Sequence, residues 1–263
     1  MSNFATIIQA TGLTLLLVII AILVGLILYL LDIDPKSHPI VLLLNIPIFS
    51  LALFVGIKVS GFNLQMILPG RSICGSSLFW ITLMTLGTII LISDITNLVF
   101  YFYPVDPEIL ALYNLIGNSK YGLVAAFVIA PVTEEVFFRG FLISGLLHNY
   151  SSTIAIVVSS LLFGLIHDNV WQSVPAIFMG VFIGWIFIIT GNIWLCIGIH
   201  AFQNGLFSIL EFAGVKFTGM IYPIESGVQF QPLWLDLTGA LLFIIGFHFI
   251  NANQKYRYVK EQN

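Results

Sequence analysis

The sequence predicts an all-α protein, a polytopic transmembrane helical bundle with about eight spans. Only 8% of its 263 residues are charged and 59% are hydrophobic, whereas roughly a quarter of the residues in a soluble domain are charged. Unbroken apolar runs recur at about 20 residues, the length that a helix needs to cross the hydrocarbon core of a bilayer. The strands of membrane β-barrels instead show short patterns in which apolar and polar residues alternate. Because the bilayer core contains no water, the backbone N–H and C=O groups must form their hydrogen bonds within helices.

The predicted spans follow one another along the whole chain. Charges and turn formers separate the first of them, with Asp32 and Pro35 after the first span and Pro69 after the second. The stretch 94–120 is more polar and contains tyrosines, which favours an interfacial connector with a short amphipathic helix at 108–116. The apolar windows place the spans at 5–31, 39–57, 77–98, 121–147, 152–168, 173–190, 193–213 and 232–250.

The chain is predicted to be one unit. It contains no internal repeat, low-complexity segment or second domain, so residues 1–263 should form a single membrane-embedded domain. The first apolar run has no basic leader and no small-residue cleavage site, which predicts a retained helix. Eight spans place both termini on one side, and Lys58, Arg71 and the basic tail at 255–260 predict that this side is cytoplasmic.

Charge and cysteine content exclude two classes of function. The net charge is −3 and no basic run is present, which excludes a nucleic-acid partner, because that would require clustered Lys and Arg facing phosphates. The two cysteines, Cys74 and Cys196, lie about 120 residues apart, so neither a disulfide framework nor a thiolate metal site is indicated. The expected surroundings are the lipid bilayer.

Three charges lie inside the fourth apolar segment: Glu134, Glu135 and Arg139. Each costs several kcal/mol at that depth unless it is paired or hydrated. Glu135 and Arg139 are four residues apart with the acid nearer the N-terminus, which favours an ion pair with a structural role. Glu134 points about 100° away around the helix. A carboxylate left unpaired in an apolar cavity is a suitable proton acceptor, so a catalytic role is predicted for Glu134.

Two histidines and an amide add polar groups at helical spacing in later segments. His167 follows Phe163 by four residues, and Asn204 follows His200 by four residues. Taken singly, each is compatible with a structural role, because buried polar groups can satisfy one another. Taken together, they complete a candidate water-activating site. Glu134 and His167 would deprotonate water, while His200 and Asn204 would donate hydrogen bonds to an oxyanion.

The three ordered patterns resemble the motifs of the CPBP (CAAX protease and bacteriocin-processing, or Abi) family of intramembrane proteases. The resemblance covers about 80 residues inside a catalytic core expected at 121–213. It implies an eight-helix bundle that hydrolyses peptide bonds of a membrane-associated peptide or protein. The matching residues are Glu134-Glu135-x-x-x-Arg139, Phe163-x-x-x-His167 and His200-x-x-x-Asn204, with Phe138-Arg139-Gly140 and Thr190-Gly191-Asn-Ile-Trp194 flanking them.

The resemblance also implies roles for these residues. Glu134 and His167 would activate the water, and His200 with Asn204 would stabilise the oxyanion. Glu135, Arg139 and Phe163 would support the site. The mechanism proposed for the related prenyl-protein proteases is metal-independent, and the chain has no HExxH motif, so no metal is expected. Zinc held by Glu134, His167 and His200 is the alternative.

The spacing of the motifs favours one branch of the family. His200 follows His167 by only 33 residues with no inserted loop, which is more similar to the bacterial bacteriocin-processing and immunity branch than to the eukaryote-type CAAX proteases. A CAAX substrate is therefore not expected, and the expected location is a bacterial cell membrane.

Two other functions compete with an endopeptidase. Intramembrane carboxylates and histidines also form proton relays in transporters, although only Pro131 and Pro175 interrupt central segments here. A non-catalytic scaffold or bacteriocin-immunity protein would keep the same bundle and bind a partner through its cavity. Loss of cleavage in Glu134 or His200 variants distinguishes the enzyme from both.

Overall fold

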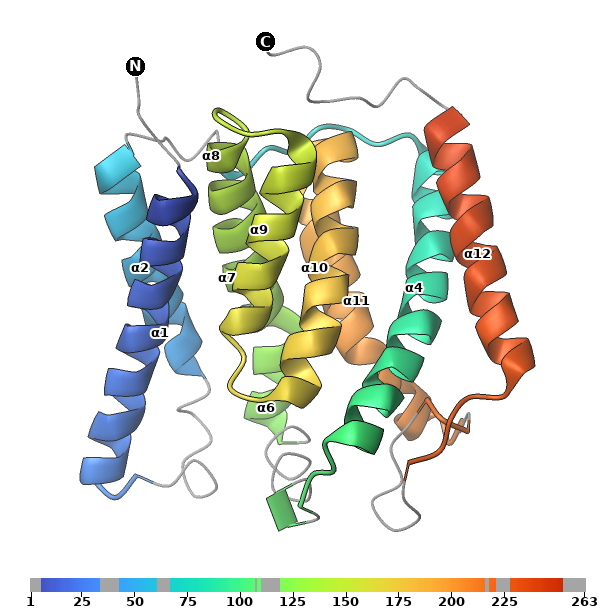
Figure 1. Ribbon diagram of the computed structural model, residues 1–263, viewed down its shortest axis with the longest axis horizontal. Coiled ribbons are helices and arrows are strands. Elements are labelled where there is room, and N and C mark those ends of the chain that lie inside the picture. Colours follow the sequence, from blue (N-terminus) through green and yellow to red (C-terminus); the bar gives the residue numbers. More distant parts are fainter. Residues whose placement is uncertain are drawn as a thin grey trace.

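The computed structural model describes residues 6–33, 43–60, 67–106, 108–109, 119–215, 218–220 and 228–252. Most of the predicted amphipathic helix at 108–116 lies outside these residues. Figure 1 shows helical passes packed side by side, each running opposite to the one before it. The eight passes in these ranges are α1 (Ile7–Leu30), α2 (Asn45–Ser60), α4 (Gly75–Phe102), the run from α6 to α8 (Lys120–Leu146), α9 (Ser152–Leu165), α10 (Val170–Thr190), α11 (Ile193–Phe212) and α12 (Leu233–Ala252).

The predicted all-α bundle is confirmed. The described residues contain no strand, and their one isolated bridge joins Gly70 to Asn192. Five helices are long and apolar enough to cross a membrane, namely α1, α4, the α6–α8 run, α10 and α12. α1 begins and α12 ends at the same end of the bundle, at the top of Figure 1. The helices therefore make an even number of passes, as predicted.

The fifth predicted span is shorter in the structure than the sequence indicated. α9 covers Ser152–Leu165 and not 152–168. Its 14 residues rise about 21 Å, less than the hydrocarbon thickness. The helix ends at Leu165, and the N–H of His167 donates to the Gly164 carbonyl at 3.2 Å as the chain leaves the helix. His167 consequently lies in the turn that follows α9.

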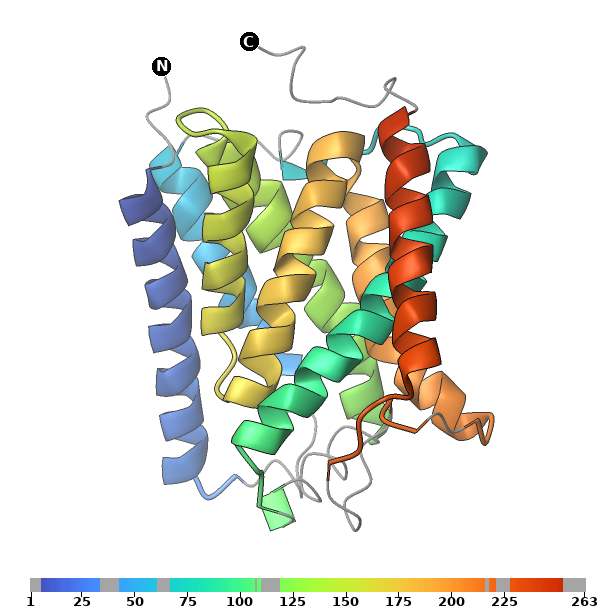
Figure 2. The same ribbon diagram turned by 45° about the vertical axis from the view of Figure 1, so that its right-hand side comes forward.

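The helices form three groups. Figures 1 and 2 show α1 with α2 on one side, α4 with α12 on the other, and the helices from α6 to α11 between them. Gly87 and Gly239 allow the close approach of α4 and α12, because a Cβ on Gly87 would collide with the Gly239 carbonyl. Gly180 brings α10 onto Ser160 of α9 in the same way. All three polar motifs lie in the central group.

Capping residues set the helix ends around the second and third motifs. Ser151 begins α9 by accepting the N–H of Ile154, and Asn169 begins α10 by accepting the N–H of Gln172 at 2.9 Å. α10 ends at Gly191, whose φ of 57° is in the left-handed region that favours glycine. The short connection makes α10 and α11 antiparallel neighbours.

The run from α6 to α8 contains two π-helical segments. α6 (Lys120–Val124) leads into η2 (Ala125–Ile129), and η3 (Val136–Ile143) follows α7 (Ala130–Glu135) and ends at α8 (Ser144–Leu146). A π-helical turn holds an extra residue, and such turns occur frequently at functional sites. The first motif therefore lies where the helical register changes on both sides. η3 also carries Phe137, Phe138 and Phe141, which are fully buried in the core.

We expect Gly140→Ala to destabilise the bundle by about 1–3 kcal/mol, the usual cost of overpacking. A Cβ on Gly140 would collide with the backbone carbonyl of Ile67, which cannot move as a flexible side chain would. Reversible unfolding in mixed micelles measures the change. Gly12→Ala is the matched control, because a Cβ there meets nothing within 4 Å. Equal stabilities of the two variants would contradict the expectation.

Candidate active site

A cavity of about 810 Å³ lies between α1, α2, α7, α10 and α11. Apolar residues of α1 and α2, among them Leu17 and Phe49, line one side of it. The four residues predicted to be catalytic, Glu134, His167, His200 and Asn204, also line it. The tertiary structure thus brings together groups from α7, the α9–α10 turn and α11.

The first motif forms the predicted ion pair. Arg139 Nη1 donates to Glu135 Oε1 at 3.0 Å, and both side chains are almost completely buried. Arg139 Nη2 donates to the Gly180 carbonyl of α10 at 3.3 Å. The guanidinium carbon lies 4.7 Å from the centre of the Phe163 ring, a cation–π distance. Arg139 therefore links the first motif to α9 and α10.

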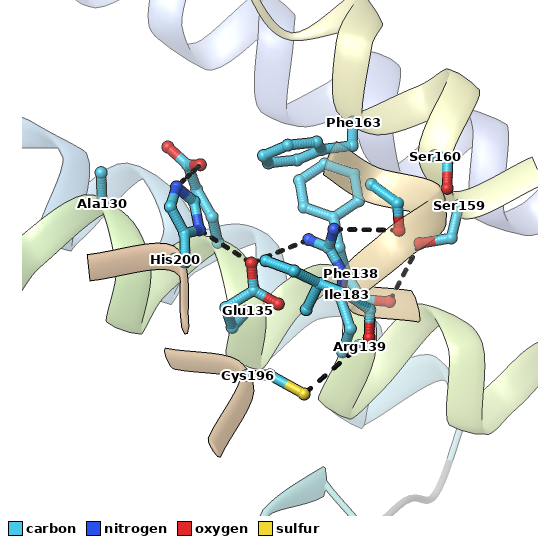
Figure 3. Close-up of polar contacts among 12 residues, drawn as sticks. Ala130, Glu135, Phe138, Arg139, Ser159, Ser160, Phe163, Ile183, Cys196 and His200 are labelled. Carbon is cyan, nitrogen blue, oxygen red and sulfur yellow. Dashed lines mark hydrogen bonds and ion pairs between the residues drawn. The ribbon is translucent and has the colours of Figure 1, made fainter. Parts of the chain in front are cut away.

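Glu135 has a second partner that the sequence analysis did not predict. His200 Nδ1 lies 2.8 Å from Glu135 Oε1, and Figure 3 shows Glu135 between the imidazole and the guanidinium. Because an ionised carboxylate only accepts, Nδ1 carries the proton and donates. The contact joins residues 65 positions apart, so helical spacing contains no signal for it. The sequence indicated only that a buried histidine at position 200 needs a hydrogen-bond partner.

The Glu135 contact aims the other nitrogen of His200 at Glu134. Nε2 lies 3.9 Å from Glu134 Oε2, which is too long for a hydrogen bond. Glu134 is 8% exposed and His200 is 6% exposed. A carboxylate behind an imidazole fixes the orientation of the ring, as supporting carboxylates do at other histidine sites. The two motifs are thereby coupled.

His167 has one nitrogen committed and one free. Nδ1 lies 3.0 Å from the Phe163 carbonyl, and because a carbonyl only accepts, Nδ1 must donate. In the neutral ring Nε2 is then a bare acceptor. Burial lowers the pKa of the His167 imidazole below its ordinary value of 6.5. His167 is therefore neutral at pH 7 and able to accept a proton.

Phe163 lies at the centre of the polar groups. Its ring centre is 5.3 Å from that of His167 and 6.0 Å from that of His200, with both pairs edge to face. Phe138 packs edge to face on the same ring at 5.1 Å. This rigid aromatic contact limits the rotation of both imidazoles. The spacing of Phe163 and His167 predicted one of these contacts.

Asn204 is held by the backbone of η2. Its Nδ2 donates to the Ala126 carbonyl at 2.9 Å. In the π-helical register that carbonyl would pair with residue 131, which is a proline without an N–H. Asn204 supplies the missing donor. One N–H of Nδ2 is used in this way, which leaves the second N–H for another acceptor.

The described residues do not assemble the alternative zinc site. No three His, Cys, Asp or Glu side chains in this part of the chain converge as a ligand group. Nδ1 of His167 and of His200 is bonded to Phe163 and Glu135, so Nε2 is the available nitrogen of each ring. Glu134, His167 and His200 line the same cavity, but among the described residues they do not form such a ligand group.

The segment that holds the site matches a known protein family. Residues 117–206, about a third of the chain, match the family model described as Type II CAAX prenyl endopeptidase Rce1-like. This segment is similar to the CPBP (CAAX protease) family. The resemblance expected from the three motifs is confirmed. The CPBP segment holds all four residues predicted to be catalytic and overlaps most of the expected core at 121–213.

The family description is that of a peptide hydrolase, so the match points to a membrane protease. With helices long enough to span a bilayer, the chain is an integral membrane protein. No curated protein and no solved structure matches the chain.

Proposed function

We propose that this protein is an intramembrane endopeptidase that hydrolyses a peptide bond with water activated by Glu134 and His167. The observation that carries the proposal is the convergence of Glu134, His167 and His200 on one buried cavity. The Glu135 carboxylate orients His200 within it. A carboxylate and a neutral imidazole that line one cavity match the requirements of general-base catalysis.

The proposed reaction proceeds by direct attack of water. The water proton passes to Glu134, with His167 Nε2 as the second acceptor, while the oxygen bonds to the peptide carbonyl carbon. Negative charge then develops on the carbonyl oxygen, where His200 Nε2 and the free N–H of Asn204 donate hydrogen bonds. The proton held by Glu134 moves to the departing amide nitrogen as the C–N bond breaks. The products are a carboxylate and an amine.

The proposed oxyanion role requires His200 to act as an imidazolium. Since Nδ1 donates to Glu135, Nε2 can donate only when the ring is an imidazolium. Glu134 Oε2 and Glu135 Oε1 lie 3.9 Å and 2.8 Å from the two ring nitrogens of His200. A carboxylate beside each nitrogen favours a cation at this position.

The proposed substrate is a peptide or a membrane protein with an apolar segment. Apolar residues of α1 and α2 line the cavity together with the polar motif residues, so it suits a chain that is itself largely apolar. The description of the matching family names a CAAX prenyl endopeptidase, whereas the interval of 33 residues between His167 and His200 without an inserted loop favours a different substrate. We further propose a bacterial cell membrane as the location, with both termini in the cytoplasm.

The experiment that tests this function is digestion of a membrane peptidome by the purified protein in bicelles. The negative control is the double variant Glu134→Gln/His200→Ala, because any cleavage that it shows comes from contaminating proteases. New peptide termini that only the wild type produces, with and without a chelator, support a metal-independent endopeptidase. Loss with chelator would support the zinc alternative. Binding of peptides without any cleavage would support a scaffold.

Acidification is expected to inactivate the enzyme. Because the pKa of His167 is lowered, its neutral form persists at pH 6.5 and is lost as the pH falls through that lower value. At pH values well below the pKa of His167, kcat/KM should fall by about tenfold per pH unit if protonation of His167 alone limits the rate. A pH profile of cleavage measures the effect, and His167→Gln should reduce the slope. A profile of His167→Gln identical in shape to that of the wild type would contradict the assignment.

A further inference from the structure

Gln203 is a cavity residue with no role in the mechanism above. It lies on α11 between His200 and Asn204, and it lines the same cavity. Residues three apart on a helix are neighbours on its surface, so Gln203 lies beside His200 on α11. His200, Gln203 and Asn204 all line the same cavity.

The side-chain oxygen of Gln203 is unsatisfied. Oε1 is buried and has no hydrogen-bond partner among the described residues. Its two neighbours differ in this respect, because His200 is bonded to Glu135 and Asn204 to the Ala126 carbonyl. An unpaired buried amide oxygen costs free energy, so a partner from outside the described residues would stabilise it. Gln203 is thus the uncommitted one of these three polar groups of α11.

We infer that the carboxamide of Gln203 binds the main chain of the peptide substrate beside the scissile bond. This inference rests on the proposed endopeptidase function. A carboxamide carries the same donor and acceptor groups as a peptide unit, so it can accept a main-chain N–H and donate to a main-chain carbonyl. Rotation about its last side-chain bond turns either end toward the cavity. The contact would set the position of the scissile carbonyl relative to His200 without selecting any side chain.

The test uses a synthetic peptide copied from the site that the wild type cleaves most strongly in the peptidome digestion. Gln203→Met keeps the length of the side chain and removes both hydrogen-bonding groups. We expect KM to rise by about tenfold, the effect of one lost hydrogen bond in binding, with kcat changed less than about twofold. Thermal stability should be unchanged or higher, because no internal hydrogen bond is lost.

A matched control and a second substrate series make the result specific. Gln172→Met alters another glutamine of the cavity wall, whose Oε1 already accepts from Asn169 Nδ2 at 2.9 Å, and it should leave KM nearly unchanged. In a series of peptides with single N-methylated positions, one position should weaken binding to the wild type and not to Gln203→Met. That pattern identifies the partner N–H.

Three outcomes would overturn the inference. The first is an unchanged KM in Gln203→Met, and the second is a fall in kcat alone, which would indicate a role in the transition state. The third is equal sensitivity of wild type and variant to every N-methylated peptide. Cleavage by the wild type in the same assay shows that the endopeptidase function stands even if Gln203 has no part in it. Absence of cleavage by the wild type overturns both.

Discussion

Glu134→Gln is expected to lower kcat/KM for peptide cleavage by about 10³-fold, within the range that general-base catalysis contributes. The amide has nearly the same shape as the carboxylate, yet it cannot accept a proton from water. Glu134 is the carboxylate of the first motif that is not bonded to Arg139, so its replacement leaves the Glu135–Arg139 pair intact. The measurement is the steady-state rate on a peptide identified in the peptidome digestion.

The fold of the Glu134→Gln variant provides the control. Because glutamine fills the same space, its unfolding midpoint in mixed micelles should lie within a few degrees of the wild-type value. A well-folded variant with wild-type cleavage would refute the catalytic role of Glu134. The transporter alternative would be favoured by a different pair of results. The wild type would show proton-coupled uptake into vesicles and no cleavage, and the well-folded variant would lose the uptake.

Arg139→Met is expected to destabilise the protein by about 3–5 kcal/mol, since it leaves a buried charge without its partner. Arg139 is 1% exposed and Glu135 is fully buried, so water cannot replace the guanidinium. The variant also removes the hydrogen bond to the Gly180 carbonyl and the contact with the Phe163 ring. Equilibrium unfolding in mixed micelles gives the free energy.

The double variant Glu135→Gln/Arg139→Met distinguishes charge burial from other effects. It removes both charges, so most of the lost stability should return. The carboxamide introduced by Glu135→Gln would still accept a hydrogen bond from His200 Nδ1, although a neutral amide no longer stabilises an imidazolium. Cleavage should consequently remain low in the double variant. If the double variant is as unstable as Arg139→Met alone, the buried charge is not the cause of the instability.

The helical bundle and most of the candidate residues were predictable from local patterns. Apolar runs of helical length indicate spans regardless of how the helices pack, because each span satisfies its own backbone. The spacing of Glu135 and Arg139 predicts their ion pair by the same local geometry. In contrast, α9 ends at Leu165, before His167, and no apolar window detects this end.

The sequence by itself determined the class of the fold and the residues that do not belong in lipid, because both follow from the cost of exposing polar groups to hydrocarbon. The tertiary structure alone decided how these residues meet. It joins Glu135 to His200, turns Nε2 of His200 toward Glu134, and anchors Asn204 on a carbonyl that Pro131 leaves unpaired. These contacts link distant parts of the chain, so they depend on helix packing and on the two π-helical segments, which spacing along the chain does not encode.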